Sequence, residues 1–321
     1  MNEKITPAAA AAAKENFREE VLNGLSESPR RLPCKFFYDE RGAHLFRQIC
    51  ELPEYYITRT EIEILRLHGA EMAKTLGPGI ELIGLGTGAG SKTQILLEEL
   101  RDPAVYVPID ISKEQLENSA ARFREMFPKL QILPVAADYL GPFELPLPRK
   151  LSSRSVIYFP GSTIGNFEPD SAGEFLTRLV DLAGDGGGLL IGVDLQKDRH
   201  VIEAAYNDSA GVTAQFNKNL LSRINRELGA DFDLAHWQHY AVYNPAEGRI
   251  ELYLLSEIDQ TASVDRRSFQ FRAGEKILTE YSYKHTIGGF ITLARQAGFH
   301  FEQVWTDDER WFGVFYFTVA N

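Results

Sequence analysis

The segment of residues 80–93, IELIGLGTGAGSKT, constrains this chain more than any other part of its sequence. An apolar run predicts a buried strand, alternating glycines predict a tight turn, and the residues after Lys92 have the pattern of a helix. Strand, turn and helix together present backbone N–H groups and a helix N-terminus to a nucleotide-like ligand. Gly86 is expected to let the ligand approach the backbone, because it carries no Cβ. The segment therefore predicts an α/β protein with a nucleotide-type cofactor.

The loop by itself leaves the class of cofactor open. Residues 84–89 fit a loose dinucleotide fingerprint that ends at Ala89. Residues 86–93 nearly fit a phosphate-binding P-loop, but Ser91 stands where that loop has its second glycine. The third class is the S-adenosylmethionine (SAM) loop of Rossmann-type methyltransferases. A glycine-rich turn without any ligand is a fourth possibility.

Strand and helix patterns alternate along the first part of the chain. Apolar segments with strand character follow the glycine loop at 104–111, 131–140, 155–167 (including a glycine-rich exit) and 189–196, with helical patterns between them. Such alternation predicts a doubly wound, mostly parallel sheet with right-handed crossovers. The fold class expected is therefore α/β, of the Rossmann type.

The alternation stops after residue 195 and resumes near residue 286. Residues 196–285 combine helical patterns with hairpin-like strands, which predicts an inserted α+β substrate-binding domain. The SAM-binding methyltransferase domain is then expected to comprise residues 1–195 and to be completed by 286–321. Its last two strands are joined by the short polar turn DDER and predict an antiparallel hairpin. Such a hairpin is typical of class I SAM methyltransferases, and not of dinucleotide dehydrogenases or P-loop kinases.

Polar residues follow the predicted strands, where ligands of parallel sheets bind. Asp110 lies 24 positions after Gly86 and is placed to bind ribose hydroxyls. Asp138 and Tyr139 could hold an adenine through its amino group and its ring face, although a turn aspartate explains Asp138 equally well. Asn166, in a glycine-rich strand exit, is a further candidate site residue.

Net charge and cysteine content limit which binding partners and which cellular compartment we expect for this chain. The formal net charge is −11 and the pI about 5.2, which argue against nucleic acid and against anionic membranes as partners. Cys34 and Cys50 are too few for a disulfide framework and fit a reducing cytoplasm. His236 and His239 lack further ligands nearby in the sequence, so we expect no metal site. A small-molecule substrate is the default expectation.

The rest of the chain favours the methyltransferase among the cofactor classes. Asp194 ends an apolar strand as a P-loop protein's Mg²⁺-binding aspartate does, but the P-loop itself lacks a glycine. No histidine ends a strand of the core domain, where a dehydrogenase would need a proton donor. A SAM site uses Gly86, Asp110 and Asp138 in sequence order, together with the terminal hairpin.

Four longer motifs resemble the histidine-specific Nα-methyltransferases of ergothioneine biosynthesis. The matching segments cover residues 37–61, 161–167, 205–233 and 278–285. The resemblance implies transfer of three methyl groups from SAM to the α-amine of L-histidine, which gives hercynine and S-adenosylhomocysteine (SAH). It also implies that no metal is required. We expect a cytoplasmic monomer with L-histidine as its small-molecule partner.

The resemblance assigns roles to substrate-binding residues. Asn166 and Tyr206 match the residues that bind the amino and carboxylate end of histidine, and they are the catalytic candidates. Glu280 and Ser282 match the pair that binds the imidazole, and their spacing of two places both on one face of a strand. From the pattern alone they could equally face solvent. Tyr55 matches the family tyrosine near the imidazole.

The resemblance also assigns cofactor-binding residues. Gly86 and Lys92 correspond to the methionine end of SAM, Asp110 to the ribose, Asp138 and Tyr139 to the adenine, and Tyr38 and Phe46 to positions that close over the cofactor. An Nα-methyltransferase for another aromatic amino acid, a regulatory SAM-binding protein and a P-loop-like ATP-binding protein remain the alternatives.

Overall fold

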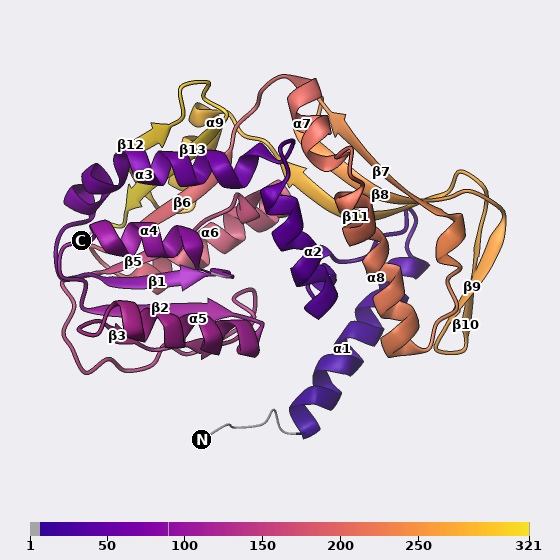
Figure 1. The fold of residues 1–321 in the computed structure, drawn as a ribbon, viewed down its shortest axis with the longest axis horizontal. Coiled ribbons are helices and arrows are strands. Elements are labelled where there is room, and N and C mark those ends of the chain that lie inside the picture. The colour runs from indigo at the N-terminus through magenta and orange to yellow at the C-terminus, as the bar shows by residue number, and fades with distance from the viewer. Residues whose placement is uncertain (1–6, 89, 321) are drawn as a thin grey trace. The chain divides into compact units, whose positions relative to one another are not determined.

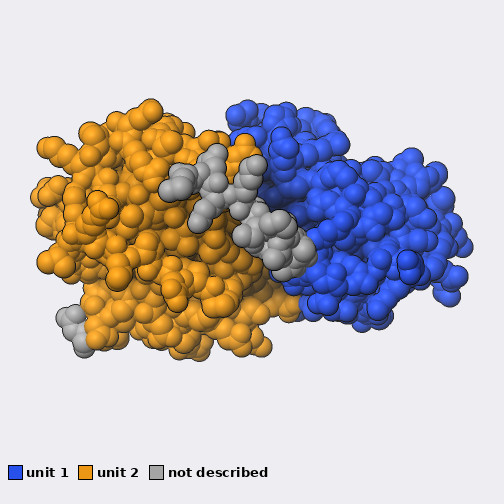
Figure 2. Space-filling view, turned by 90° about the horizontal axis from the view of Figure 1, so that it is seen from below, with its two compact units in different colours: residues 1–56, 198–282 blue, residues 57–197, 283–321 orange. Residues whose placement is uncertain are grey.

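A computed structural model describes residues 7–88 and 90–320, with side chains from residue 14 onward in the first helix. Ala89, the end of the dinucleotide fingerprint, lies outside the described residues. The chain divides into two compact units (Figure 2). Unit 1 comprises residues 1–56 and 198–282, and unit 2 comprises residues 57–197 and 283–321. Each unit is described below by itself.

The N-terminal segment clusters with the middle of the chain, whereas the sequence places it with the SAM-binding domain. Residues 1–56 belong to unit 1 together with 198–282. The backbone of Leu32 donates to the carbonyl of Leu278 at 2.8 Å, and the amide of Leu278 donates to Arg30 at 2.9 Å. These long-range hydrogen bonds explain the difference, because local sequence patterns carry no information about them.

Unit 2 is built on one large sheet, shown in Figure 1. In the described part of this unit eight strands pair in the order β12-β13-β6-β5-β1-β2-β3, with β4 also on β2. The strands are β1 (Glu81–Leu85), β2 (Val105–Asp110), β3 (Gln131–Ile132), β4 (Val135–Ala136), β5 (Ser155–Phe159), β6 (Gly188–Asp194), β12 (His300–Thr306) and β13 (Phe312–Thr318). Strand β1 is buried along its whole length, as a central parallel strand should be.

The strand directions confirm the predicted doubly wound sheet and its closing hairpin. Strands β1, β2, β5 and β6 run parallel to one another. Strand β13 is antiparallel both to β6 and to β12. The predicted third strand, 131–140, is shorter than expected, because only the two-residue strands β3 and β4 pair with β2.

Helices cover both faces of this sheet. The helices of unit 2 are α3 (Tyr56–Leu76), α4 (Ser91–Glu99), α5 (Lys113–Met126), α6 (Pro169–Ala183) and α9 (Ile287–Gln296), with the short η2 (Thr163–Asn166) after β5. Phe175 of α6 and Phe290 of α9 join the buried cluster that contains Val107 of β2. Tyr106, whose side chain points to the opposite face, packs its ring on Phe123 of α5 at 5.4 Å. The sheet is therefore sandwiched, as the alternating pattern predicts.

Unit 1 combines helices with two small antiparallel sheets. Its helices are α1 (Pro7–Ser26), η1 (Cys34–Phe37), α2 (Glu40–Glu51), α7 (Arg199–Tyr206), α8 (Val212–Leu228) and η3 (Leu234–His236). Its strands are β7 (Trp237–Asn244), β8 (Arg249–Ser256), β9 (Gln260–Val264), β10 (Arg267–Phe271) and β11 (Lys276–Tyr283), ordered β11-β8-β7 and β10-β9. The hairpin predicted at 236–257 is confirmed by the antiparallel β7–β8 pair. Strands β9 and β10 form a second antiparallel hairpin, which was not predicted.

Asp39 joins two helices of unit 1. Its carboxylate caps α2 by accepting from the backbone N–H of Gly42 at 2.7 Å. It also accepts from the amide of Asn219 at 2.8 Å and from Arg226 at 2.5 Å, both on α8. Burial alone would raise the pKa of Asp39, but these donors outweigh it and hold the pKa below its usual value. The capping residue thus ties α2 to α8.

A buried ion cluster lies at the carboxyl end of β6 in unit 2. The Asp194 carboxylate is fully buried and contacts Lys197 at 2.5 Å and Lys284 at 2.8 Å. Burial alone would raise the pKa of Asp194, and the two ammonium groups reverse that effect and lower it. Burial also lowers the pKa of Lys197 to about 8, although Asp194 opposes the shift.

His285 makes the stability of the fold sensitive to acid. Burial lowers the pKa of its imidazole from 6.5 to about 4, so the folded state holds the neutral ring. In the unfolded chain His285 binds a proton below about pH 6.5, whereas in the folded protein it stays neutral until about pH 4. We therefore expect the free energy of unfolding to fall by about 3 kcal/mol from this residue as the pH drops through that window. Urea unfolding between pH 7 and pH 4 measures it.

The control is His285→Phe, which cannot be protonated and keeps a ring against Phe290, whose centroid lies 5.2 Å away. This variant should lose stability less steeply between pH 6.5 and 4 than the unchanged protein. Equal slopes for the two proteins would contradict the assignment.

Candidate functional site

The carboxyl ends of β1 and β5 mark the topological switch point of the sheet in unit 2, where the order in which strands are added reverses. From β1 the chain continues to β2 on one side, whereas from β5 it continues to β6 on the other. Ligands of doubly wound sheets bind in the crevice at such a switch point. The candidate site of unit 2 is therefore the set of loops that leave these strands.

Gly86 leaves β1 in a conformation that only glycine adopts without strain. Its φ is +59°, and its N–H donates to the carbonyl of Ile109 at 2.9 Å. A Cβ added at Gly86 would lie 3.3 Å from Cε1 of Tyr139. Two predicted cofactor residues are thus neighbours, and any larger side chain would occupy the space beside them. This fits a loop that a cofactor approaches closely.

Asp110 ends β2 and faces the same glycine loop. One carboxylate oxygen accepts from the backbone N–H of Gly88 at 3.2 Å, and the other accepts from Ser112 at 2.9 Å. Each carboxylate oxygen has two lone pairs, so these bonds leave acceptor capacity for ribose hydroxyls. Ser112 is the N-cap residue of α5, and its side chain makes no capping hydrogen bond.

Asp138 and Tyr139 lie after β4 with different surroundings. The Asp138 carboxylate accepts from the backbone N–H of Leu140 at 2.9 Å, which is the turn role left open by the sequence. The Tyr139 ring packs against Phe159 and Phe175, with centroids 5.6 and 6.0 Å away. Adenine binding by this pair stays a prediction.

Lys92, on the first turn of α4, is held by a carboxylate that sequence reasoning missed. Its Nζ lies 2.5 Å from Oε2 of Glu61 on α3. The same carboxylate accepts from the backbone N–H of Gly161, after β5, at 2.9 and 3.1 Å from its two oxygens. Glu61 is fully buried. Through its contacts with Lys92 and Gly161, it links the start of α4, which follows the glycine loop of β1, to the loop that leaves β5.

The sequence contains a signal for Glu61. Ile57, Ile64 and Leu65 are buried, and they lie at spacings of four, three and four from Glu61. A charged residue in the middle of an apolar helical stripe points into the core. Space for it is left by Gly192 on β6, where a Cβ would come within 2.3 Å of Oε1 of Glu61.

Asn166 ends η2, directly after β5, and is half-buried. Ser162 begins this turn with φ +58° and accepts from the backbone N–H of Asp194 at 2.9 Å. Gly165 lies so close to the backbone of Tyr283, which also belongs to unit 2, that a Cβ would come within 2.8 Å of the carbonyl of Tyr283. The loop is therefore firmly packed, and Asn166 has a defined position at the carboxyl end of the sheet.

In unit 1 the structure brings together Tyr206 and Ser282, two of the predicted substrate residues. The phenol of Tyr206 and the hydroxyl of Ser282 are 3.0 Å apart, and both residues are buried. Sequence reasoning assigned them to different ends of the substrate and did not predict this contact.

Tyr55 lies beside this pair, within an aromatic group. Its ring centroid is 6.2 Å from that of Tyr206 and 6.3 Å from that of Phe46, and Tyr38 is 5.4 Å from Phe46. Burial raises the pKa of the Tyr55 phenol well above its usual value, with smaller effects from Tyr206 and Glu280 among others. Tyr55 is therefore a neutral donor at physiological pH.

One further member of this group, Phe216, was not predicted. Phe216 of α8 packs against both Tyr38 and Phe46, at 5.6 and 5.9 Å. Burial, followed by the nearby charge of Glu280, raises the pKa of the Cys34 thiol to about 12, which keeps that thiol protonated. The group thus joins segments far apart in the chain, and Tyr38 is its exposed member.

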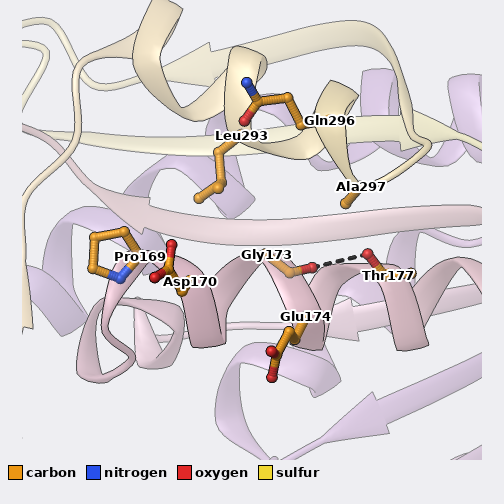
Figure 3. A pocket seen from close by; sticks show the side chains of 8 residues that line it. All are labelled: Pro169, Asp170, Gly173, Glu174, Thr177, Leu293, Gln296 and Ala297. Atoms are coloured by element: carbon orange, nitrogen blue, oxygen red, sulfur yellow. Dashed lines mark hydrogen bonds between the residues drawn. The ribbon is translucent and has the colours of Figure 1, made fainter.

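A separate surface hollow lies between α6 and α9 of unit 2 (Figure 3). It is lined by Pro169, Asp170, Gly173, Glu174, Thr177, Leu293, Gln296 and Ala297. None of the residues proposed for the cofactor or the substrate is in this lining, so we assign no function to it.

The P-loop alternative does not fit the structure. It requires the Asp194 carboxylate to bind Mg²⁺, whereas this carboxylate is buried between two lysines.

Among the residues that the structure describes, no group of three or more His, Cys, Asp or Glu side chains is arranged to hold a metal ion. The same residues include no helix with the length and apolar character needed to cross a membrane.

Comparison with known proteins identifies the family. The family described as histidine-specific, SAM-dependent methyltransferases matches residues 17–319. Histidine N-alpha-methyltransferase of Mycolicibacterium smegmatis is 40% identical over 314 residues, which cover 95% of this chain and 96% of that protein. The protein of the same name from Mycobacterium tuberculosis is 40% identical over 302 residues, covering 92% and 93%.

A solved structure gives a more distant comparison. The CcbJ methyltransferase of Streptomyces caelestis aligns with a TM-score of 0.45 and 12% identity, covering 80% of this chain and 96% of that one. The sheet order, the glycine loop and the near-complete sequence match lead to one conclusion. This chain belongs to the family of histidine-specific, SAM-dependent methyltransferases.

Proposed function

We propose that this enzyme transfers three methyl groups from SAM to the α-amine of L-histidine, producing hercynine for ergothioneine biosynthesis. The two relatives with 40% identity bear the name histidine N-alpha-methyltransferase, and the Neurospora crassa relative is called ergothioneine biosynthesis protein 1. The observation that carries the proposal is the Tyr206–Ser282 contact of 3.0 Å, beside Tyr55, because it groups donors suited to a small polar substrate.

The residues of unit 2 support binding of SAM. The open backbone at Gly86 suits the methionine end, and the Lys92 ammonium suits its carboxylate. Asp110 suits the ribose, and Asp138 and Tyr139 the adenine. SAM supplies an electrophilic methyl group on a sulfonium. Tyr38 and Phe46 of unit 1 are proposed to cover the cofactor.

The substrate is proposed to be held through its two polar ends. Asn166 can donate to the carboxylate and accept from the amine, and the Tyr206 phenol can donate to the carboxylate. Glu280 accepts from one imidazole N–H, Ser282 serves the other ring nitrogen, and Tyr55 lies beside the ring. These contacts hold the amine in position for in-line attack, which supplies much of the rate in such a displacement.

The stoichiometry requires a proton to leave for every methyl group gained. The α-ammonium loses a proton, the free amine forms a bond to the methyl carbon, and the carbon–sulfur bond breaks to give SAH. Three rounds convert an ammonium with three hydrogens into a trimethylammonium group and release three protons. Aromatic side chains near the amine tolerate the final quaternary cation.

Calorimetry and mass spectrometry test this function. L-histidine, and its dimethylated form, are titrated into the protein with and without SAH, and a reaction with SAM is followed by mass. Binding of histidine together with products of one, two and three added methyl groups is the expected result. Intact SAH binding without histidine binding would favour another aromatic amino acid. Monomeric state, cytoplasmic location and independence from metals stay predictions.

Glu280→Ala tests recognition of the imidazole. Hydrogen bonds to charged groups contribute about 1.5–3 kcal/mol, so the Kd of L-histidine should rise roughly 10- to 150-fold. The Kd of SAH should stay within about twofold, because the proposed cofactor residues are untouched. An unchanged histidine affinity would remove Glu280 from the binding site, as titration calorimetry can decide.

A further inference from the structure

Helix α7 is attached to the free edge of the β11-β8-β7 sheet by polar contacts at alternate residues of β7. Glu203 accepts from the backbone N–H of Tyr243 at 2.9 Å, and the amide of Asn207 donates to the carbonyl of Ala241 at 3.0 Å. The next contact involves the side chain of His239, whose Nε2 lies 2.8 Å from the carbonyl oxygen of Tyr206. The edge of the sheet thus holds the end of the helix that carries Tyr206.

The neighbours of His239 determine its tautomer. A carbonyl oxygen only accepts, so Nε2 carries the hydrogen and donates it to Tyr206. Nδ1 then accepts from Nδ2 of Asn217, 2.9 Å away on α8. Nδ2 of Asn217 also donates to the carbonyl of Tyr253 at 3.0 Å, which fixes the orientation of the amide. Burial, as the largest effect, lowers the pKa of His239, in agreement with a neutral ring.

This chain of contacts ends at a group of the proposed substrate site. Tyr206 is the last residue of α7, and the last carbonyls of a helix accept from groups outside it, as the carbonyl of Tyr206 does from His239. Helix α7 has only eight residues, and so short a helix depends on tertiary contacts for its geometry. The backbone at Tyr206 in turn sets where its phenol lies, which here is 3.0 Å from Ser282.

We propose that His239 is a positioning residue for the methyltransferase reaction: its Nε2–H holds the Tyr206 carbonyl and thereby aims the Tyr206 phenol at the substrate. The inference rests on the proposed role of Tyr206 in binding histidine. His239 itself touches neither the substrate nor SAM in this role. It acts through the backbone of Tyr206, and Asn217 keeps its ring in the required tautomer.

Two substitutions of His239 separate its two hydrogen bonds. In His239→Asn the side-chain oxygen can replace Nδ1 as acceptor from Asn217, but the side chain is too short to reach the Tyr206 carbonyl. In His239→Gln the longer amide can donate to that carbonyl. In His239→Asn the Tyr206 carbonyl loses the donor that holds it, so the phenol is misplaced. If the substrate contact of the phenol weakens by about 1–3 kcal/mol, the KM of L-histidine should rise roughly 5- to 150-fold.

His239→Gln and a control at His236 show whether the effect on KM comes from the hydrogen bond to Tyr206. His239→Gln should recover most of the loss in histidine KM, and SAH affinity should stay within about twofold in both variants. His236→Asn is the matched control: its side chain is 44% exposed and lies near Asp233, so the KM should not change. A His239→Asn enzyme with unchanged histidine KM, or a His239→Gln enzyme as impaired as His239→Asn, would overturn the proposal.

A measurement without substrate keeps the inference independent of the proposed function. Unfolding free energies of the unchanged protein, His239→Asn, Tyr206→Phe and the double variant form a double-mutant cycle. If His239 aims the phenol at Ser282, removing the phenol hydroxyl should matter less once His239 is replaced, so the effects should not add. Additive effects would overturn the inference. A protein that binds SAH but leaves histidine unmethylated would contradict the proposed function only, and the cycle would still decide the role of His239.

Discussion

Asp194→Asn is expected to lower the free energy of unfolding by about 3–5 kcal/mol, which is the cost of leaving a buried charge without its partner. The Asp194 carboxylate and the Lys284 side chain are fully buried, and the Lys197 side chain is only 4% exposed. Asparagine has nearly the same size, so the loss reports charge and not packing. A typical domain has a total stability of 5–15 kcal/mol, so the change could unfold much of the protein at 37 °C. Urea unfolding followed by circular dichroism measures it.

A second substitution in the same cluster separates charge from shape. Lys284→Met leaves Asp194 paired with Lys197, so a one-to-one ion pair remains and the loss should be smaller. The triple variant Asp194→Leu, Lys197→Met, Lys284→Met removes every charge and should be more stable than Asp194→Asn, because buried pairs are often replaceable by apolar groups. Asp194→Asn within 1 kcal/mol of the unchanged protein would contradict the electrostatic explanation.

Glu61→Gln is expected to weaken SAH binding at least tenfold and to lower stability by about 1–3 kcal/mol. Glutamine keeps the size but removes the charge that pairs with Lys92 at 2.5 Å. Its amide NH₂ must also face a donor, because both Lys92 and the Gly161 N–H point at the carboxylate. The Lys92 side chain is 15% exposed and can turn toward solvent, so the stability loss should be smaller than at Asp194. The Kd of SAH, measured by calorimetry, is the deciding quantity.

Matched variants show whether this effect belongs to the site. Glu63→Gln changes an exposed residue of the same helix and should alter neither stability nor SAH affinity. Glu61→Gln combined with Lys92→Met removes both partners, so the second change should cost less SAH affinity than Lys92→Met does alone. If Glu61→Gln binds SAH as the unchanged protein does, the carboxylate serves only the fold.

The architecture of unit 2 could be predicted because its signals are local. Apolar runs such as 189–196, glycines in the loop at 84–90 and the helical patterns between strands depend on neighbours in the sequence. The terminal hairpin was likewise predicted from two apolar runs around a short turn, and the antiparallel β12–β13 pair confirms it. The length of the edge strand predicted at 131–140 was overestimated, because its apolar run continues past the residues that pair with β2.

Contacts between distant segments could not be predicted in the same way. The attachment of residues 1–56 to unit 1 depends on hydrogen bonds such as that from Leu32 to Leu278. Glu61 had a sequence signal in its apolar stripe, but its partners Lys92 and Gly161 lie 31 and 100 positions away. His239 was expected to be an ordinary histidine, since nothing adjacent in the sequence shows that it meets Tyr206.

By itself the sequence determined the fold class, the family and the types of residue available for chemistry, because periodicity, turn composition and long motifs are properties of the chain alone. Only the tertiary structure decided which of those groups are neighbours. It paired Tyr206 with Ser282, placed Glu61 between Lys92 and Gly161, and buried Asp194 between two lysines. The physical reason is that burial and charge pairing depend on distances in space, and a folded chain brings together residues that are far apart along it.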